Sequence, residues 1–376
     1  MATATRQMTQ SRKIRVGIVF GGQSAEHEIS ILSARNVLKA LDRSRFEPIL
    51  IGIDKSGGWL VQSEQKLLSG STDPRKVRID SGVPVQLASP FTGLSTEPAS
   101  RVDGLDVIFP VLHGTLGEDG AMQGLLEVAG IPYVGAGVLG SAIGMDKDVM
   151  KRLLRDAGIP IADFRCIHQD RFDARPVQFC AELVAMGLPL FIKPANAGSS
   201  VGIRKVMTAT ALEDAIRYAF GFDSKVLAEA AIIGREIELA VLGGNPPSAS
   251  VPGEIIVEHA DGFYSYDAKY IDEHGARFEM PARITSEECQ RAQALALRAF
   301  EVLECDGMAR VDLFLQPDGL LLVNEINTIP GFTAISMYPK LWALSGVGVT
   351  ELVTRLIDLA LKRAQRRGEL RRSFIS

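Results

Sequence analysis

A lysine followed by a run of small residues is the first feature of this sequence that could bind a ligand. Lys193 ends an apolar stretch, and residues 194–202 after it are mostly small. Small side chains let backbone N–H groups approach polyphosphate oxygens closely, and a lysine at a strand end adds a positive charge for the same phosphates. No Gly-Lys-Ser/Thr sequence follows, so the stretch is not a Walker A loop. A flexible surface loop beside an ordinary lysine would have the same composition, so this segment alone leaves both interpretations open.

A second group of polar residues has the alternating spacing of a β-hairpin. Arg310 and Asp312 are two positions apart on one predicted strand, and Glu325 and Asn327 are two apart on the next. Each pair therefore faces one side of the hairpin. Carboxylate and amide oxygens at this density suit Mg²⁺ that also keeps substrate phosphates as ligands. A cross-strand ladder of salt bridges would use the same residues, but Gly331 follows closely and can present a backbone N–H to a developing negative charge, which favours a site.

The elements that must position these groups follow an α/β pattern. Residues 14–20 predict a strand, residues 25–41 a helix and residues 48–53 a second strand, with a glycine turn after the first strand. Such a unit indicates a parallel sheet that binds ligands near the carboxyl ends of its strands. Residues 55–101 are rich in Ser, Gly, Pro and charge, and they predict a peripheral insertion of loops and weak strands.

The rest of the chain continues the mixture of strands and helices. We expect further strands at 107–112, 190–193, 203–206, 226–229, 236–242, 309–316 and 320–326. We expect helices at 121–129, 145–157, 211–220, 286–303 and 350–366, and a long loop at 260–282.

Residues 135–140 match the dinucleotide-binding pattern G-x-G-x-x-G. That pattern has meaning when it joins the first strand of a dinucleotide fold to its helix. Here the apolar stretch before it is short, contains Pro132, and comes after two other strand-to-helix turns. We therefore predict a connector between domains rather than a nicotinamide site.

Length and charge limit the classes of partner. The chain has 376 residues, enough for two or three domains, and its 41 Lys and Arg against 45 Asp and Glu leave a net charge of −4. No basic excess is present for a nucleic-acid backbone, no run of about 20 apolar residues occurs, and the four cysteines have neither metal nor redox spacing. We expect a cytoplasmic enzyme without nucleic-acid or membrane partners.

Seven stretches together resemble the D-alanine–D-alanine ligase family of the ATP-grasp superfamily. They occur in the expected order at residues 21–28, 113–120, 144–147, 193–202, 264–270, 307–312 and 324–331. The resemblance runs from about residue 14 to residue 364. It implies an N-terminal parallel-sheet domain (1–135), a central ATP-grasp domain (136–228) and a C-terminal ATP-grasp domain (229–376), with ATP bound between the last two.

The resemblance also implies how ATP, the co-substrate, is held. The residues that match the family's ATP contacts are Lys147 and Lys193 at the phosphates, Ser200 in the phosphate loop, Glu229 and the backbone near Ile232 at the adenine edge, Glu236 at the ribose, Ile203 and Phe263 at the faces of the base, and Lys269. Many relatives carry lysine or glutamine after the residue matching Glu229, whereas this chain has Ala230. We therefore assign that position no side-chain role.

By the same resemblance, two Mg²⁺ or Mn²⁺ ions are held by Asp312, Glu325 and Asn327. The carboxylate of a first D-alanine attacks the γ-phosphate of ATP, giving D-alanyl phosphate and ADP, and the amine of a second D-alanine then attacks the acyl phosphate. Arg310 and the Gly331 N–H are expected to stabilise the resulting oxyanion.

Residues at the substrate end of the site follow from the resemblance too. Glu26 matches the carboxylate that binds the ammonium group of the first D-alanine, His113 lies beside it, and Ser336 is expected to hold the carboxylate of the second. The loop at 260–282 matches a lid that keeps water from the acyl phosphate. Within it, Tyr270 is expected to bond Ser199, which reaches Glu26, and its neutral side chain favours D-alanine over D-lactate as the second substrate.

Three alternatives remain open from the sequence. The chain could be another ATP-grasp carboxylate–amine ligase with a different acceptor, a nicotinamide-dependent oxidoreductase using residues 135–140, or a nucleotide sensor without catalysis. The resemblance further implies a homodimer formed through the N-terminal domain.

Overall fold

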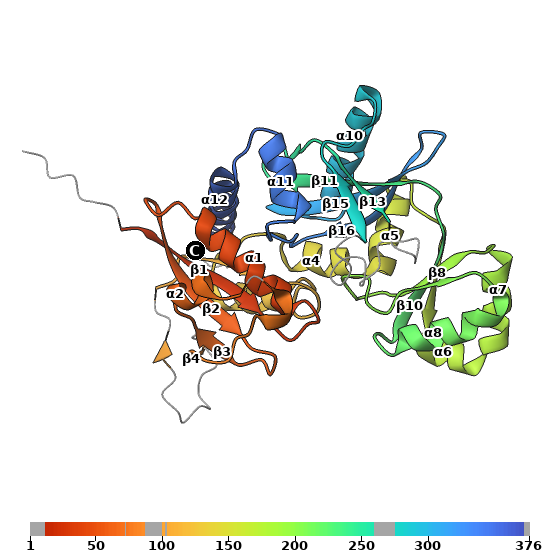
Figure 1. Ribbon diagram of the computed structural model, residues 1–376, viewed down its shortest axis with the longest axis horizontal. Coiled ribbons are helices and arrows are strands. Elements are labelled where there is room, and N and C mark those ends of the chain that lie inside the picture. The colour runs from red at the N-terminus through yellow and green to blue at the C-terminus, as the bar shows by residue number, and fades with distance from the viewer. Residues whose placement is uncertain (1–11, 72, 87–99, 102–103, 259–274, 372–376) are drawn as a thin grey trace, which may run out of the picture.

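The computed structural model describes residues 12–71, 73–86, 100–101, 104–258 and 275–371. The described residues form three β-sheets, of six, four and six strands. Figure 1 shows a lobe around each sheet: an N-terminal lobe in red and orange, a lobe in green at the opposite end, and a C-terminal lobe in blue between them. The mixed α/β composition agrees with the predicted fold class.

The N-terminal sheet has the strand order β5-β4-β3-β2-β1-β6, and β1 pairs in parallel with both β2 and β6. The predicted strand–helix–strand unit is therefore confirmed. Residues 55–101 add strands at one edge of the sheet plus a helix, α2, that was not predicted. The elements of this lobe are β1 (Ile14–Gly21), α1 (His27–Ala40), β2 (Phe46–Ile53), β3 (Trp59–Val61), α2 (Glu64–Ser69), the 3-10 turn η1 (Pro74–Lys76), β4 (Val83–Gln86), β5 (Ser100–Arg101), β6 (Val107–Val111) and α3 (Ala121–Ala129).

The sheet of the second lobe is antiparallel, in the order β7-β10-β8-β9. Helices α6, α7 and α8 cover one face, where Ile192 of β8 and Val226 of β10 are buried among them. Because strand residues alternate between faces, Lys193 and Glu229 lie on the other face. The elements are β7 (Phe164–His168), α6 (Gln169–Ala174), α7 (Pro176–Ala185), β8 (Leu190–Pro194), β9 (Arg204–Val206), the 3-10 turn η2 (Ala209–Ala211), α8 (Leu212–Phe220) and β10 (Lys225–Ala230).

The C-terminal sheet has the order β14-β13-β11-β15-β16, and β12 also pairs with β11. One face packs on α10 and on α4 and α5 from earlier in the chain, through residues such as Leu239 and Val311. The elements are α4 (Val138–Met145), α5 (Lys147–Asp156), β11 (Arg235–Leu242), β12 (Ser248–Ala249), β13 (Gly253–Val257), β14 (Ala276–Glu279), α10 (Ser286–Val302), β15 (Met308–Leu315), β16 (Leu321–Asn327), α11 (Met337–Leu344) and α12 (Val349–Gly368).

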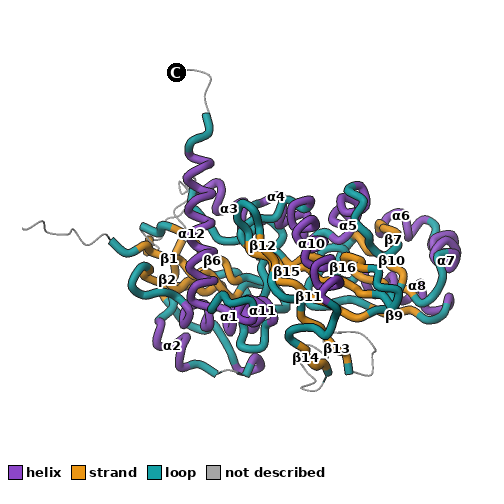
Figure 2. Tube along the Cα trace, turned by 90° about the horizontal axis from the view of Figure 1, so that it is seen from above, coloured by secondary structure: helices purple, strands orange, loops and turns teal. Residues whose placement is uncertain are grey.

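The N-terminal and C-terminal lobes share one hydrophobic core. Residues of β1 and α1, such as Phe20 and Val37, belong to the same buried cluster as Leu356 and Ile357 of α12. Figure 2 shows α12 beside the N-terminal lobe, with its last turns projecting from the body. The shared core holds α1, and with it the predicted substrate residue Glu26 just before the helix, at a fixed place relative to the third sheet.

Two predicted segments differ in detail from the structure. The helix expected at 145–157 begins at Lys147, and a separate helix, α4, precedes it. The break occurs at Asp146, whose carboxylate caps α5 by accepting hydrogen bonds from the backbone N–H groups of Asp148 and Val149. The predicted loop at 260–282 contains the short strand β14, and its residues 260–274 lie outside the described part of the chain.

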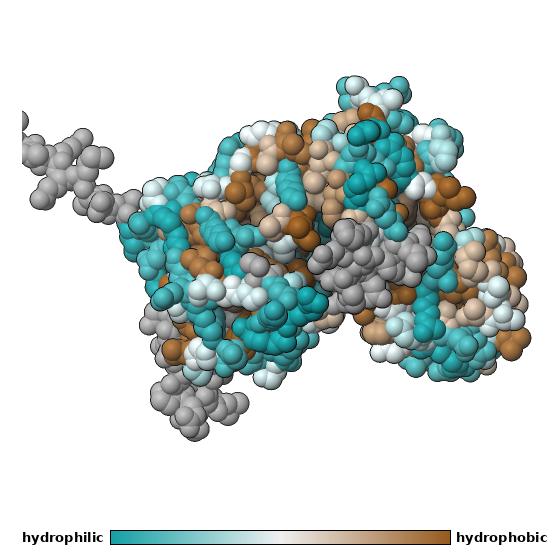
Figure 3. Space-filling model, viewed as in Figure 1, coloured by the Kyte–Doolittle hydropathy of each residue, from teal (hydrophilic) through white to brown (hydrophobic). Residues whose placement is uncertain are grey.

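The surface of the molecule is a mixture of hydrophilic and hydrophobic residues (Figure 3). On the face drawn in Figure 3, hydrophilic residues predominate over the N-terminal lobe, with small hydrophobic groups between them. Among the described residues, no helix combines the length and the apolar character that crossing a bilayer requires.

Candidate active site

Two adjoining cavities lie where the three lobes meet. The smaller, of ≈ 120 Å³, is lined by predicted ATP and metal residues: Lys147, Lys193, Ser200, Ile203, Glu229, Glu236, Asp312 and Glu325. The larger, of ≈ 500 Å³, is lined by the predicted substrate residues Glu26, His113, Gly331 and Ser336, together with Asn327. Ser199 and Arg310 line both cavities. Most of the predicted site residues thus come together although they are far apart in sequence.

The predicted residues that do not contribute to these cavities fall into two groups. Ile232 follows β10 and is half-buried, but its side chain lines neither cavity. Phe263, Lys269 and Tyr270 lie outside the described residues, so their predicted roles stay predictions.

The phosphate loop, residues 194–202, contacts the start of α5. The backbone N–H of Lys147 donates to the Ala195 carbonyl at 3.1 Å, and its ammonium group donates to the Ala197 carbonyl at 2.8 Å. Lys147 Nζ also lies 3.6 Å from a carboxylate oxygen of Glu325 on β16. The first residue of α5 therefore joins the loop to the predicted metal residues.

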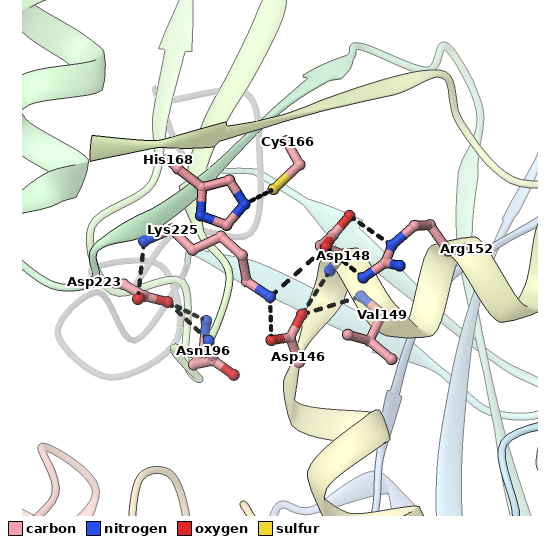
Figure 4. A network of polar contacts seen from close by, with 9 residues as sticks. All are labelled: Asp146, Asp148, Val149, Arg152, Cys166, His168, Asn196, Asp223 and Lys225. Carbon is pink, nitrogen blue, oxygen red and sulfur yellow. Dashed lines mark hydrogen bonds and ion pairs between the residues drawn. The ribbon is translucent and has the colours of Figure 1, made fainter. Parts of the chain in front are cut away.

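A polar network behind this loop holds α5 and β10 together (Figure 4). Lys225 of β10 pairs with the capping carboxylate of Asp146 and lies 3.7 Å from Asp148. Asp223 accepts hydrogen bonds from the backbone and side-chain nitrogens of Asn196, at 2.9 and 3.0 Å, and a third from the Lys225 backbone N–H at 3.0 Å. Both the loop and the helix that carries Lys147 are thus fixed to the same strand.

Lys193 forms an ion pair with Glu229 in the wall of the smaller cavity. Its ammonium group lies 2.7 Å from one oxygen of Glu229, and the other oxygen of Glu229 lies 2.6 Å from Lys151 of α5. Burial would raise the pKa of Glu229, but the two ammonium groups outweigh it and hold that pKa below its usual value. The sequence reasoning missed Lys151; its spacing of four residues after Lys147, on the same helical face, is the signal that could have found it.

The hairpin β15–β16 brings its four polar residues to one surface, as predicted. In its register Arg310 lies opposite Asn327, and Asp312 lies opposite Glu325. The guanidinium group of Arg310 donates two hydrogen bonds of 2.7 Å to Asp312, and Asn327 donates a third to the same carboxylate at 3.0 Å. The arrangement is one connected polar surface, rather than a row of separate ion pairs.

Glu238 of β11, which the sequence reasoning missed, completes the surroundings of Arg310. It lies opposite Asp312 in the sheet and 3.2 Å from the Arg310 Nε. Burial alone would lower the pKa of Arg310, but Asp312 and Glu238 raise it well above its usual value. The guanidinium group is therefore a permanent positive charge at the junction of the two cavities.

The acidic and amide oxygens of this surface suit Mg²⁺ shared with a nucleotide. Among the described residues, no three His, Cys, Asp or Glu side chains are arranged as a complete metal site. Mg²⁺ commonly takes one or two carboxylates from the protein and the remaining ligands from substrate phosphates and water. Asp312, Glu325 and Asn327 fit that use because they line the cavities beside Lys147 and Arg310.

Three side chains from loops of the N-terminal lobe line the larger cavity: Glu26, His113 and Glu118. Ser199 of the phosphate loop donates a hydrogen bond to Glu26, which joins two lobes. His113 is buried, its Nδ1 lies 3.0 Å from the Ile329 carbonyl, and burial lowers its pKa. Glu118, a residue the sequence reasoning did not select, accepts hydrogen bonds from the backbone N–H groups of Gly114 and Ile329. Burial and the neighbouring Glu26 raise the pKa of Glu118 to about 8.

Gly331 and Ser336, which follow β16 in the chain, also line the larger cavity. The hydroxyl oxygen of Ser336 lies 3.0 Å from the Thr333 backbone nitrogen, which donates to it. A Cβ atom at position 331 would lie 2.8 Å from that hydroxyl oxygen, closer than real Cβ atoms come. A larger residue at position 331 would therefore displace the Ser336 hydroxyl group from its present place beside the cavity.

Comparisons with known proteins agree with this geometry. Family models for the N-terminus and the C-terminus of D-ala D-ala ligase match residues 15–136 and 153–358. A D-alanine--D-alanine ligase A of Chromobacterium violaceum is 52% identical over 96% of this chain and 99% of that protein. The D-alanine--D-alanine ligase of Oceanobacillus iheyensis is 49% identical over 96% of this chain and 99% of its own length.

Solved structures give the same result. The D-alanine-D-alanine ligase from Coxiella burnetii has a TM-score of 0.82 and 39% identity, covering 95% of this chain and 96% of that one. The VanG D-Ala:D-Ser ligase from Enterococcus faecalis has a TM-score of 0.80 and 36% identity, covering 93% of this chain and 100% of that one. With two matched domain models and relatives at about half identity over nearly its whole length, the chain belongs to the D-alanine–D-alanine ligase family.

Proposed function

We propose that ATP binds in the smaller cavity, that both amino-acid substrates bind in the larger one, and that Arg310 acts where the two meet. As a member of its family, the chain ligates two D-alanine molecules with ATP for peptidoglycan synthesis. The observation that supports the assignment of the cavities is that Arg310 and Ser199 line both of them. A carboxylate in the larger cavity and a terminal phosphate in the smaller one would meet beside a fixed guanidinium group.

In the first step, a carboxylate oxygen of the first D-alanine forms a bond to the γ-phosphorus of ATP. The bond from that phosphorus to the β-phosphate oxygen breaks, and ADP is the leaving group. Lys147, Lys193 and Arg310 offset the negative charge that spreads over the transferred group. Glu26, fixed by its hydrogen bond from Ser199, accepts the substrate ammonium group and orients the attacking carboxylate.

In the second step, the amine nitrogen of the second D-alanine attacks the acyl carbon of D-alanyl phosphate and loses a proton, and inorganic phosphate leaves. The tetrahedral oxyanion forms beside Arg310 and the Gly331 N–H, which stabilise it. Ser336 holds the carboxylate of the second substrate.

Asp312, Glu325 and Asn327 would hold two Mg²⁺ or Mn²⁺ ions. Divalent ions supply neutralisation of the β- and γ-phosphates when bound. An ionised carboxylate has more acceptor sites than its hydrogen bonds from Arg310 use, so Asp312 can serve as a ligand while Arg310 stays paired with it and with Glu238.

The remaining proposals concern the second substrate, the domain boundaries, the oligomeric state and the location of the protein. We infer D-alanine as the preferred second substrate over D-serine, because the relatives at about 50% identity are named for D-alanine. We propose domain boundaries at residues 135 and 228, a homodimer formed through the N-terminal domain, and a cytoplasmic location, with which the four free cysteines agree.

Replacing Glu26 with glutamine tests the assignment of the larger cavity. The variant keeps the side-chain shape but loses the charge that attracts the substrate ammonium group. We expect the KM for D-alanine to rise about tenfold or more, while the KM for ATP stays within about twofold. Glu47→Gln, at an exposed position on β2, is the matched control and should behave as wild type. A rise in the KM for ATP with no change for D-alanine would contradict the assignment.

A further inference from the structure

Lys151 is a fully buried lysine in the second turn of α5. Its exposed fraction is 0%, and its ammonium group contacts Glu229 at 2.6 Å and lies 6.0 Å from the centre of the Phe164 ring. A lysine is rarely buried so completely, because removing an ammonium group from water costs several kcal/mol unless a partner offsets the cost. No step of the proposed mechanism uses this residue.

The partner of Lys151 is shared with a residue of the ATP cavity. Glu229 is 3% exposed, and its two oxygens bind different lysines: Oε1 lies 2.7 Å from Lys193, and Oε2 lies 2.6 Å from Lys151. Lys193 and Glu229 line the smaller cavity, whereas Lys151 lies behind them. Burial lowers the pKa of Lys151, and the Glu229 carboxylate opposes that shift. With both lysines protonated and Glu229 ionised, the three groups together carry a single positive charge.

Without Lys151, that charge would be lost from the wall of the cavity. Lys193 and Glu229 alone form a neutral pair, which would attract a polyphosphate only weakly. With Lys151 present, the carboxylate is balanced from behind, and the charge of Lys193 remains effective towards the cavity. The effect acts over a short distance in a region from which water is largely excluded, so screening by solvent is reduced.

We propose that Lys151 is a positioning residue for ATP binding, which neutralises Glu229 from behind so that Glu229 can orient Lys193 without cancelling its charge. This inference rests on the proposed function of the smaller cavity. Lys151 touches neither substrate nor the reacting atoms, and its effect passes through Glu229 and Lys193.

The competing view is that Lys151 only fixes α5 to β10. In that case its removal would disturb Lys147 at the start of the helix as well, and it would lower stability and activity whatever residue stands at position 229. Charge balance predicts that the effect depends on position 229. When the charge of Glu229 is removed together with that of Lys151, Lys193 is left with its single positive charge.

The test compares Lys151→Met with the double variant Lys151→Met/Glu229→Gln. The affinity for the magnesium complex of a non-hydrolysable ATP analogue is measured by calorimetry, and KM values for ATP and D-alanine are measured by ADP release. Lys362→Met, which removes an exposed lysine of α12, is the matched control for the loss of one positive charge. Thermal unfolding of every variant confirms that the proteins compared are folded.

We expect Lys151→Met to bind the analogue about tenfold or more weakly than wild type, with the KM for D-alanine unchanged. The double variant should bind about threefold or more tightly than Lys151→Met, although it stays weaker than wild type because the predicted adenine contact of Glu229 is altered. Equal binding by Lys151→Met and wild type, or a double variant as weak as Lys151→Met, would overturn the proposal. If Lys151→Met does not fold, the double variant is compared with Glu229→Gln, and a loss of affinity of about tenfold or more between these two would overturn the proposal. A wild-type protein that releases no ADP with D-alanine would instead contradict the proposed function.

Discussion

Replacement of Arg310 with methionine is expected to lower kcat by about 10³-fold, because among the described residues Arg310 carries the one guanidinium group that lines both cavities. Methionine keeps much of the length and volume of the side chain but offers no donor to a developing negative charge. Arg310→Lys should be intermediate, since lysine keeps the charge but lacks the planar fork that donates twice to Asp312. Steady-state ADP release with saturating ATP and D-alanine measures the effect.

Two further measurements separate catalysis from folding. Removing Arg310 takes away the guanidinium group that pairs with both Glu238 and Asp312, so we expect Arg310→Met to be less stable by about 3–5 kcal/mol. Binding of an ATP analogue shows whether the folded fraction keeps its nucleotide site. Arg171→Met, at an exposed position on α6, should match wild type in both activity and stability. A folded Arg310→Met protein that retained more than a tenth of the wild-type kcat would contradict the role given to this arginine.

Replacement of Asp312 with asparagine should lower activity at a fixed magnesium concentration by about 10²-fold or more, because a charged oxygen ligand is lost. Increasing the magnesium concentration should restore part of the activity, since weaker binding is offset by mass action. The measurement is a magnesium titration of ADP release in wild type and variant.

Asp318→Asn is the matched control for this second variant. Asp318 lies in the turn between β15 and β16, where its carboxylate accepts a hydrogen bond from the Leu320 backbone N–H, and asparagine can accept the same bond. We expect its magnesium dependence to equal that of wild type. An Asp312→Asn protein with an unchanged magnesium requirement would remove Asp312 from the metal site.

The hairpin of the site was predictable because its information is local. Arg310, Asp312, Glu325 and Asn327 are spaced two apart on strands joined by a short turn, and the alternation of strand residues determines which face they share. The register then confirms the pairing of Asp312 with Glu325. The composition of residues 194–202 was compatible with a phosphate-binding loop, but that segment alone left a flexible surface loop equally open.

The partners that hold these residues were not predictable in this way. Apart from its spacing of four from Lys147, Lys151 has the sequence pattern of an ordinary helical lysine, and its burial depends on Glu229 of β10 in the second lobe. Glu238 likewise resembles any strand glutamate until β11 is placed beside β15. Tertiary contacts decide which charged side chains can be buried. The spacing of residues along one element does not show which distant side chain will offset the free-energy cost of removing a charge from water.

Element boundaries depended on single residues that the periodicity could not reveal. The helix predicted to begin at residue 145 begins at Lys147, because Asp146 caps it and pairs with Lys225 of β10, and α4 before it was not predicted. The short elements β7, β13 and α11 were missed because few residues in each give a clear period. Their positions are determined by pairing or packing with β10 and β11.

The fate of a carboxylate oxygen tests the central claim most directly, because the proposed path transfers one oxygen of the first D-alanine to phosphate. D-alanine labelled with oxygen-18 in its carboxylate is incubated with the protein, ATP and magnesium, and the inorganic phosphate is examined by mass spectrometry. The account predicts one labelled oxygen in the phosphate for each dipeptide formed. Dipeptide formation with unlabelled phosphate would show that no acyl phosphate forms at this site and would contradict the account.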